Sequence, residues 1–247
     1  MTEELKKRLE FLASKYETNA FPDADPSQFL KWYSKAEDIE VSAFIAAMLS
    51  FGNRKQFIPK IKEIFLLADK KGGICNWILS SAWVKDFRTS DENDEIKFYR
   101  FYSYGDMKEL FSVFKKLLNE YGSFSNYLRK YNSVSEVVEA VSLAFCDCSI
   151  VPKGKNSANK RLYMFLRWMI RRNSPVDLGL WDWLSPEELI IPLDTHVIQE
   201  SVKLGLIPEN SAASLKTAIK ITEELKKVWP DDPCKGDFAL FGLGVDE

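Results

Sequence analysis

Apolar residues recur along most of the chain at spacings of three and four, which is the period of an amphipathic α-helix. In residues 2–16, for example, Leu5, Leu9 and Leu12 share one face. Residues 37–51 are rich in alanine and large aliphatic side chains, which predicts a helix inside the core. The chain has no sustained period-two alternation and no Asn-Gly or Asp-Gly hairpin turn. The pattern therefore predicts an all-α fold.

Capping residues mark the boundaries of further helices. Asp25 and Pro26 favour a helix start, since aspartate caps an N-terminus and proline fits the first turn. Residues 185–188 have the form of a capping box, and Gly205 fits a helix end. Residues 86–97 are polar and charged and indicate a loop. The other predicted helices cover residues 55–69, 105–120, 123–131, 134–147, 157–172, 195–204, 210–228 and 236–242.

Composition indicates an ordinary globular protein. The chain has 247 residues, of which 46% are hydrophobic and 28% charged, enough for a sizeable core. Proline and glycine punctuate the helices and form no linker, so we expect one compact unit. No apolar run approaches the roughly 18 residues that span a bilayer, and the charged N-terminus lacks a signal-peptide core. We therefore expect a cytoplasmic protein without membrane contact.

The cysteines and the histidine give no sign of a metal site. The chain has four cysteines and one histidine, and the Cys146–Cys148 spacing is too short for the usual paired-thiolate ligands. We predict no metal cluster and no cofactor, with the cysteines as free or structural thiols.

Positive charge is concentrated in one segment. The formal net charge is −2, yet no acidic residue lies between Asp147 and Asp177. The basic residues of this segment are Lys153, Lys155, Lys160, Arg161, Arg167, Arg171 and Arg172. A positive face on an acidic body is typical of an anion-binding surface, and a solvated helix face is the alternative.

On a helix over residues 157–172, two faces separate. One face is apolar and predicts core packing, with Leu162, Phe165, Leu166 and Met169. The other face carries Lys160, Met164, Arg167 and Arg171. Asn156 or Ser157 would cap the start, and the basic turn before it, residues 152–155, would lead to backbone N–H groups that bind phosphate. These contacts would position the protein on a duplex without reading its sequence.

Asp194 precedes a predicted helix, and His196 follows it by two residues. Aspartate is a favoured N-cap, so capping alone explains Asp194. A carboxylate held there could also stabilise a cationic transition state, with one oxygen capping the helix and the other facing a substrate. A packing or hydrogen-bonding role is the simpler interpretation of His196.

Residues 192–197, Pro-Leu-Asp-Thr-His-Val, resemble the Val-Asp-Thr-His segment of helix-hairpin-helix DNA glycosylases, the endonuclease III superfamily. Residues 48–55 resemble the helix break that enters the opened duplex in those enzymes, and residues 238–242 resemble a late helix of that fold. Residues 160–169, 190–194 and 237–245 together resemble an uncharacterised prokaryotic family, over most of the chain. That family is itself similar to a distant glycosylase branch, nearest the archaeal 8-oxoguanine glycosylases.

The resemblance implies a two-lobed helical bundle with a central cleft. One lobe would cover approximately residues 37–150, and the N-terminal helices with residues 157–247 would form the rest. It also implies a catalytic pair, Lys160 and Asp194. The usual Leu-Pro-Gly-x-Gly hairpin is reduced here to one proline and one glycine in residues 151–155, so Lys155 is the alternative lysine. A register shift of one would align Arg161, which cannot act as an amine nucleophile.

The remaining predicted site residues fall into two groups. Duplex-binding residues would be Lys153, Gly154, Lys155, Arg161, Arg167, Arg171, Asn53 and Arg54, with Asn53 replacing the glutamine that fills the gap left by a flipped base. The pocket for that base would be lined by Trp168, Trp181, Trp183, Phe241 and His196. Core packing is the alternative role for the tryptophans.

The predicted function is base-excision repair on double-stranded DNA that contains a damaged base, such as an oxidised purine. Lys160, neutral in a desolvated site, would attack the sugar C1′ of a flipped nucleotide, and Asp194 would stabilise the developing charge. AP-lyase activity could follow through a Schiff base. The alternatives are a catalytically inactive nucleic-acid-binding module of the same fold and a helical protein adaptor. Functional groups of Lys160 and Asp194 that converge on one cleft within about 6 Å would favour catalysis. A Lys160 side chain that points to bulk solvent away from Asp194 would favour the binding module.

Overall fold

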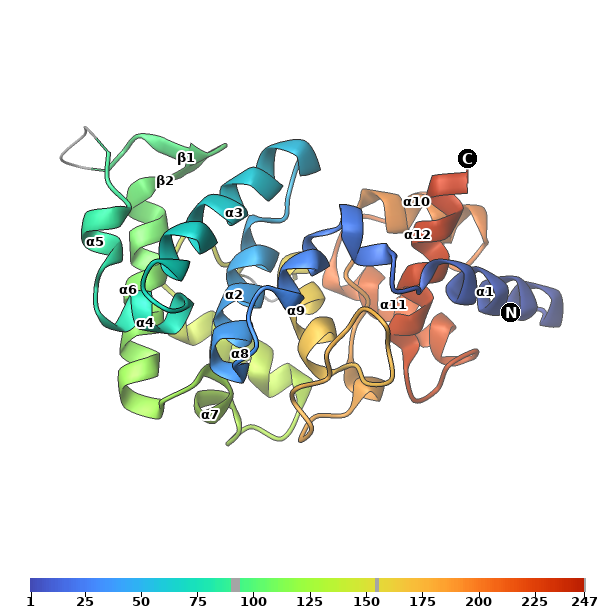
Figure 1. Cartoon of the computed structure of the whole chain (residues 1–247). Helices are drawn as coiled ribbons and strands as arrows, with labels where there is room; N and C mark the ends of the chain where they lie inside the picture. Colours follow the sequence, from blue (N-terminus) through green and yellow to red (C-terminus); the bar gives the residue numbers. More distant parts are fainter. Residues whose placement is uncertain (90–93, 154–155, 247) are drawn as a thin grey trace. The chain divides into compact units, whose positions relative to one another are not determined.

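The computed structural model describes residues 1–89, 94–153 and 156–246 (Figure 1). It is mostly helical, with one two-stranded sheet in that part of the chain, so the predicted all-α class is confirmed. Contacts divide the chain into two compact units. Unit 1 comprises Met1–Ala24 with Lys153–Glu247, and unit 2 comprises Asp25–Pro152.

Unit 2 is built around α2 (Ala36–Leu49), which is buried from Asp38 to Leu49 because nearly every face is apolar. The Phe44 ring on this helix packs against Phe114, Phe124 and Phe145. The other elements of unit 2 are a 3-10 helix (Pro26–Lys31), α3 (Arg54–Asp69), α4 (Ile74–Leu79), α5 (Trp83–Asp86), β1 (Lys97–Tyr99), β2 (Tyr102–Ser103), α6 (Tyr104–Tyr121), α7 (Phe124–Leu128) and α8 (Val134–Ala144).

Two buried carboxylates on α2 hold neighbouring helices. Asp38 accepts a hydrogen bond of 2.8 Å from the Cys75 N–H in the first turn of α4, and Glu40 accepts one of 3.0 Å from the Ser125 N–H in the first turn of α7. Helix N-termini carry unpaired N–H groups and partial positive charge, so the acids are satisfied inside the core.

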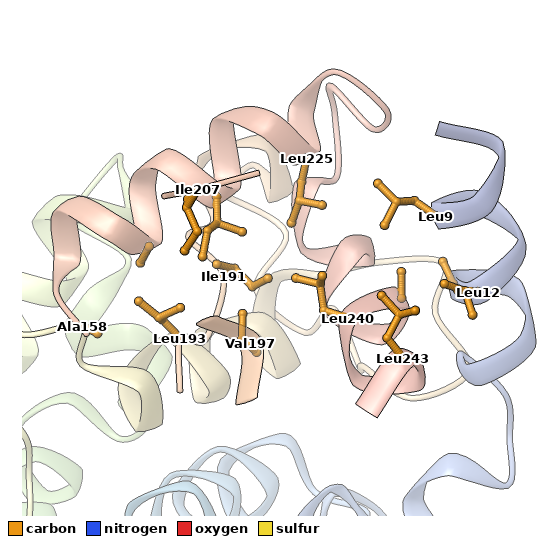
Figure 2. Close-up of a cluster of buried hydrophobic side chains, with 14 residues drawn as sticks. Leu9, Leu12, Ala158, Ile191, Leu193, Val197, Ile207, Leu225, Leu240 and Leu243 are labelled. Carbon is orange, nitrogen blue, oxygen red and sulfur yellow. The ribbon is translucent and has the colours of Figure 1, made fainter. Parts of the chain in front are cut away.

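Unit 1 contains α1 (Glu3–Tyr16), α9 (Lys160–Ile170), α10 (Thr195–Lys203), α11 (Leu215–Lys226), α12 (Gly236–Asp246) and 3-10 turns at Phe21–Ala24, Pro186–Glu188 and Pro233–Lys235. Figure 2 shows its core, in which Leu9 and Leu12 of α1 face Leu240 and Leu243 of α12. Ile191, Leu193 and Val197 extend the same cluster. The apolar segment before Asp194 is therefore anchored in the core.

Several sequence predictions hold at the element level. Asp25 caps the 3-10 helix that starts at Pro26, and Gly205 follows α10 with a φ of 68°. The predicted capping box at residues 185–188 is wrong, because Ser185 makes no side-chain cap and only a 3-10 turn forms. The sequence pattern does not predict the β1–β2 hairpin, because its strands of three and two residues are too short to show alternation.

Candidate active site

Lys160 is the first residue of α9, which begins later than predicted. The N-cap is Asn159, whose φ of 43° lies in the left-handed region that asparagine tolerates, and it makes no side-chain capping bond. The predicted caps Asn156 and Ser157 are therefore wrong.

Asp194 is the N-cap of α10, as predicted. Its backbone is extended, and its Oδ1 accepts a hydrogen bond of 2.9 Å from the Val197 N–H. This bond fixes the carboxylate at the positive end of the helix. The second oxygen, Oδ2, faces away from the cap.

The Lys160 ammonium and Asp194 meet directly. Lys160 Nζ donates to Asp194 Oδ2 at 2.8 Å, and the two side chains are 37% and 36% exposed. Both charged groups thus belong to one unit, are in contact, and remain accessible from solvent. The distance between Lys160 Nζ and Asp194 Oδ2 is well below the roughly 6 Å expected of a catalytic pair.

The charge state of Asp194 follows from these contacts. Burial alone would raise the pKa of its carboxyl group, but the Lys160 ammonium and the Val197 N–H together lower the pKa below its ordinary value. His196 adds a smaller effect in the same direction. Asp194 is consequently an ionised carboxylate at neutral pH.

A second carboxyl group, Asp237 in the first turn of α12, belongs to the same electrostatic environment. It forms an ion pair with Arg167 of α9, and its side chain is 16% exposed. Burial, with a smaller contribution from the Asp194 carboxylate, raises the pKa of Asp237 to about 6 against the opposing effect of Arg167. Lys160 lowers the pKa of Asp237, so these groups sense one another's charge.

Arg167 and Arg171 are buried, at 4% and 1% exposure. Arg167 pairs with Asp177 and Asp237, and Arg171 pairs with Glu17, Asp177 and Asp232. The prediction that these arginines form an exposed phosphate-binding face is therefore wrong. Their charges are neutralised by acids outside α9, namely Asp177 in the segment that follows the helix and the distant residues Glu17, Asp232 and Asp237. The helical pattern of α9 alone could not reveal these partners.

The other predicted duplex-binding residues have different surroundings. Lys153 is exposed and Arg161 is partly exposed in unit 1, whereas Gly154 and Lys155 lie outside the described residues. In unit 2, Asn53 caps α3 by accepting from the Lys55 N–H, and Arg54 lies 3.6 Å from Asp25 with 45% of its side chain exposed. These residues remain candidates for nucleic-acid contact.

Two of the predicted base-pocket residues are core residues. Trp168 and Trp181 are both fully buried, and Trp181 packs edge-on against Phe165. A base cannot stack on a ring without access, so that prediction is wrong for both. Trp183 is partly exposed and lies on Trp181.

Phe241 lies on α12, and His196 lies on α10 close to α12. Phe241 is partly buried and packs edge-on against Tyr16 and Phe21. His196 is exposed on α10 but lies so close to Gly244 that a Cβ there would come within 1.6 Å of Nε2. Of the five predicted pocket residues, His196 is exposed and Trp183 and Phe241 are partly exposed, so the pocket role of these three stays a prediction.

Asp237 is a candidate site residue that the sequence analysis did not single out. The available signal was an acid at the first turn of a strongly apolar helix. Such a carboxyl group is held against the core, where an ionised carboxylate needs a cationic partner because burial of an unpaired charge costs free energy.

In the described part of the chain, no group of three or more His, Cys, Asp or Glu side chains is arranged to hold a metal ion. No helix among the same residues is long and apolar enough to cross a membrane.

Residues 25–246 match DUF2400, a family described as a protein of unknown function. The chain belongs to the DUF2400 family. The match covers all of unit 2 and most of unit 1, including Lys160, Asp194 and Asp237. The curated proteins and the solved structures gave no match.

Proposed function

We propose that this DUF2400 protein is a DNA glycosylase with AP-lyase activity, in a fold of the helix-hairpin-helix glycosylase type. The observation that carries the proposal is the contact of 2.8 Å between Lys160 Nζ and Asp194 Oδ2, with both groups accessible from solvent. The sequence resemblance supplies the reaction class, and an oxidised purine is the first candidate base. The substrate is double-stranded DNA with one damaged nucleotide turned out of the stack.

In the proposed reaction, Lys160 attacks as a neutral amine after its proton passes to solvent, so that Asp194 stays ionised. The Nζ lone pair forms a bond to the sugar C1′ while the C1′–N glycosidic bond breaks, and the base leaves with that electron pair and takes up a proton. Asp194 stabilises the positive charge that develops on the sugar. Because its cap bond fixes Oδ1, Oδ2 stays in place when Lys160 moves toward the substrate.

Strand cleavage follows from the same intermediate. The C1′–O4′ bond opens, O4′ takes up a proton, and a Schiff base to Lys160 forms. Loss of a C2′ proton then expels the 3′ phosphate, and water releases the enzyme. Asp237 is suited to proton transfer in these steps, because a carboxyl group with a pKa of about 6 can take up and release protons near neutral pH.

Borohydride trapping tests the proposal without knowledge of the lesion. A duplex that carries a preformed abasic site presents the aldehyde directly, and borohydride reduces the Schiff base to a stable protein–DNA adduct. We expect the wild-type protein to give this adduct. Lys160→Arg should lower the yield by about 100-fold or more, because arginine keeps the charge but cannot act as an amine nucleophile.

Matched variants separate chemistry from folding. Lys226→Gln removes another ion-paired lysine of unit 1, which pairs with Glu223 at 3.0 Å, and should leave the adduct yield unchanged. Asp194→Asn keeps a capping oxygen but removes the charge, and should slow base removal on a panel of damaged duplexes. Equal trapping by wild type and Lys160→Arg would exclude Lys160 as the nucleophile. DNA binding with no adduct on any substrate would favour the inactive binding module.

A further inference from the structure

An exposed aromatic stack lies on unit 2, away in sequence from the candidate active site. Phe101, in the turn between β1 and β2, is 59% exposed. Its ring stacks on Phe51, which follows α2, with 5.1 Å between centroids and an angle of 24° between the planes. A largely exposed ring that is held by a stacked neighbour presents apolar aromatic surface to solvent.

Arg100 adds a cation to this stack. Its guanidinium lies 5.6 Å from the Phe51 centroid and 5.9 Å from that of Phe101. Arg100 has a φ of 52°, in the left-handed region that is costly for a residue with a side chain. A strained backbone at the turn thus holds the cation next to the rings.

The turn and the α2–α3 loop are fitted to each other. Gly52 has a φ of 80°, and a Cβ there would come within 2.3 Å of Arg100 Nη1 and 3.0 Å of the Tyr99 hydroxyl. The Tyr99 hydroxyl donates a hydrogen bond to the Phe51 carbonyl. Glycine at this position therefore gives the guanidinium room to lie over the rings.

Further cations lie on the same two segments. Arg54 and Lys55 follow Gly52 and are exposed, and Lys97 on β1 donates to the Phe101 carbonyl at 3.0 Å. Two acids on neighbouring segments are paired, Asp25 with Arg54 and Asp94 with Lys108. The surface therefore combines an exposed aromatic ring with the cationic side chains of Arg54, Lys55, Lys97 and Arg100.

We infer that the Phe51–Phe101–Arg100 cluster binds an unpaired base of a nucleic-acid strand, with Arg54 and Lys55 binding the adjoining phosphates. Every base has a π face that stacks on an aromatic ring, and arginine strengthens such contacts while lysine and arginine neutralise phosphate. The inference rests on the proposed function for the choice of DNA as the partner. It adds a second contact surface that is separate from the Lys160–Asp194 chemistry.

The test measures DNA binding by the full chain. Fluorescence anisotropy compares a duplex containing one unpaired base with a fully paired duplex of the same length. Phe101→Ala should weaken binding to the unpaired-base duplex by about 5-fold or more, the effect of losing one stacked base, and should change binding to the paired duplex less than twofold. Phe101→Trp should keep the preference, because tryptophan retains a stacking face.

Two controls address folding and charge. Phe11 on α1 is 67% exposed, and Phe11→Ala should bind both duplexes as the wild type does. Arg100→Asn removes the cation with a residue that tolerates positive φ, and should weaken binding to the unpaired-base duplex. 2-Aminopurine as the unpaired base should show quenched fluorescence with wild type and recovery with Phe101→Ala.

Three outcomes would overturn the inference. Phe101→Ala could bind both duplexes like the wild type, or it could lose both equally. Sedimentation could instead show that Phe101→Ala abolishes self-association without changing DNA binding, which would make the stack a protein interface. Abasic-site trapping at Lys160 with no effect of Phe101 would reject this inference alone, whereas a Phe101 effect without trapping would reject only the proposed chemistry.

Discussion

Asp194 performs two tasks with two oxygens. Oδ1 accepts the Val197 N–H, and Oδ2 accepts from Lys160 Nζ. The helix cap orients the carboxylate before any substrate arrives, so its position does not depend on the lysine. A charged group held by backbone in this way loses little to reorganisation when charge develops nearby, which is the requirement for electrostatic stabilisation of a transition state.

The partly buried acid Asp237 should make stability depend on pH. Its pKa rises from 3.8 to about 6 in the folded protein. A carboxyl group whose pKa is raised by folding contributes stability below the unfolded pKa and loses it as pH rises through the folded pKa. Relative to Asp237→Asn, the wild-type protein should therefore lose free energy of unfolding between about pH 4 and pH 6, at about 1.4 kcal/mol per unit of pKa shift.

Urea unfolding of both proteins across that pH range measures this difference. Asp231→Asn, at an exposed position in the segment before α12, serves as the control and should run parallel to the wild type. A difference between wild type and Asp237→Asn that stays constant from pH 4 to pH 7 would contradict the raised pKa.

The residues that could be predicted are those whose roles are local. Asp194 was predicted as a cap because the cap bond joins residues three apart in sequence. Arg171 was predicted to be exposed because the helical pattern of α9 does not show its acidic partners. Those partners are Glu17, Asp177 and Asp232, which come from three other segments. A basic helix face that binds phosphate and one that is buried against distant acids have the same periodicity.

At the scale of elements, α12 depends on glycine for close packing. Gly242 faces the Tyr16 ring of α1, and a Cβ there would come within 2.0 Å of the ring. In an exposed helix, alanine is favoured over glycine by about 1 kcal/mol. Here we expect Gly242→Ala to destabilise the protein by about 1–3 kcal/mol, because the added methyl group forces α1 and α12 apart.

Thermal or urea unfolding measures that change. Gly105 in α6 is the matched control, since the nearest atom to its added Cβ is 3.4 Å away, and Gly105→Ala should be neutral or slightly stabilising. Equal effects of the two substitutions would show that Tyr16 moves aside without cost.

The sequence pattern predicts the presence of the helices better than the residues at which they begin and end. The amphipathic patterns located α1, α3 and α6 closely, whereas α9 starts at Lys160 because the preceding residue turns left-handed. The β1–β2 hairpin escaped prediction because its stability comes from aromatic packing of Phe98, Tyr99 and Tyr102 against residues outside the strands. Short elements held by tertiary contacts leave little trace in local periodicity.

At the scale of the molecule, the two units differ in how the chain builds them. Unit 2 is one continuous segment, Asp25–Pro152, with its own central helix and aromatic core. We therefore expect a fragment of residues 25–152 to fold alone, with a helical circular dichroism spectrum and cooperative urea unfolding. A fragment of residues 153–247 lacks α1, which covers α12, and should unfold at lower urea or aggregate.

A broad, non-cooperative transition for the 25–152 fragment would contradict this expectation. So would a 153–247 fragment as stable as the intact chain, because it would mean that α1 contributes no packing energy to α12.

The packing of α1 on α12 has a consequence for biosynthesis (Figure 1). A ribosome delivers α1 long before α12, and all of unit 2 emerges between them. Leu9 and Leu12 lack their packing partners Leu240 and Leu243 until translation reaches α12, at roughly 5–20 residues per second. During that interval the apolar stripe of α1 is a target for chaperones, and translational stalling before α12 would leave it exposed to proteolysis.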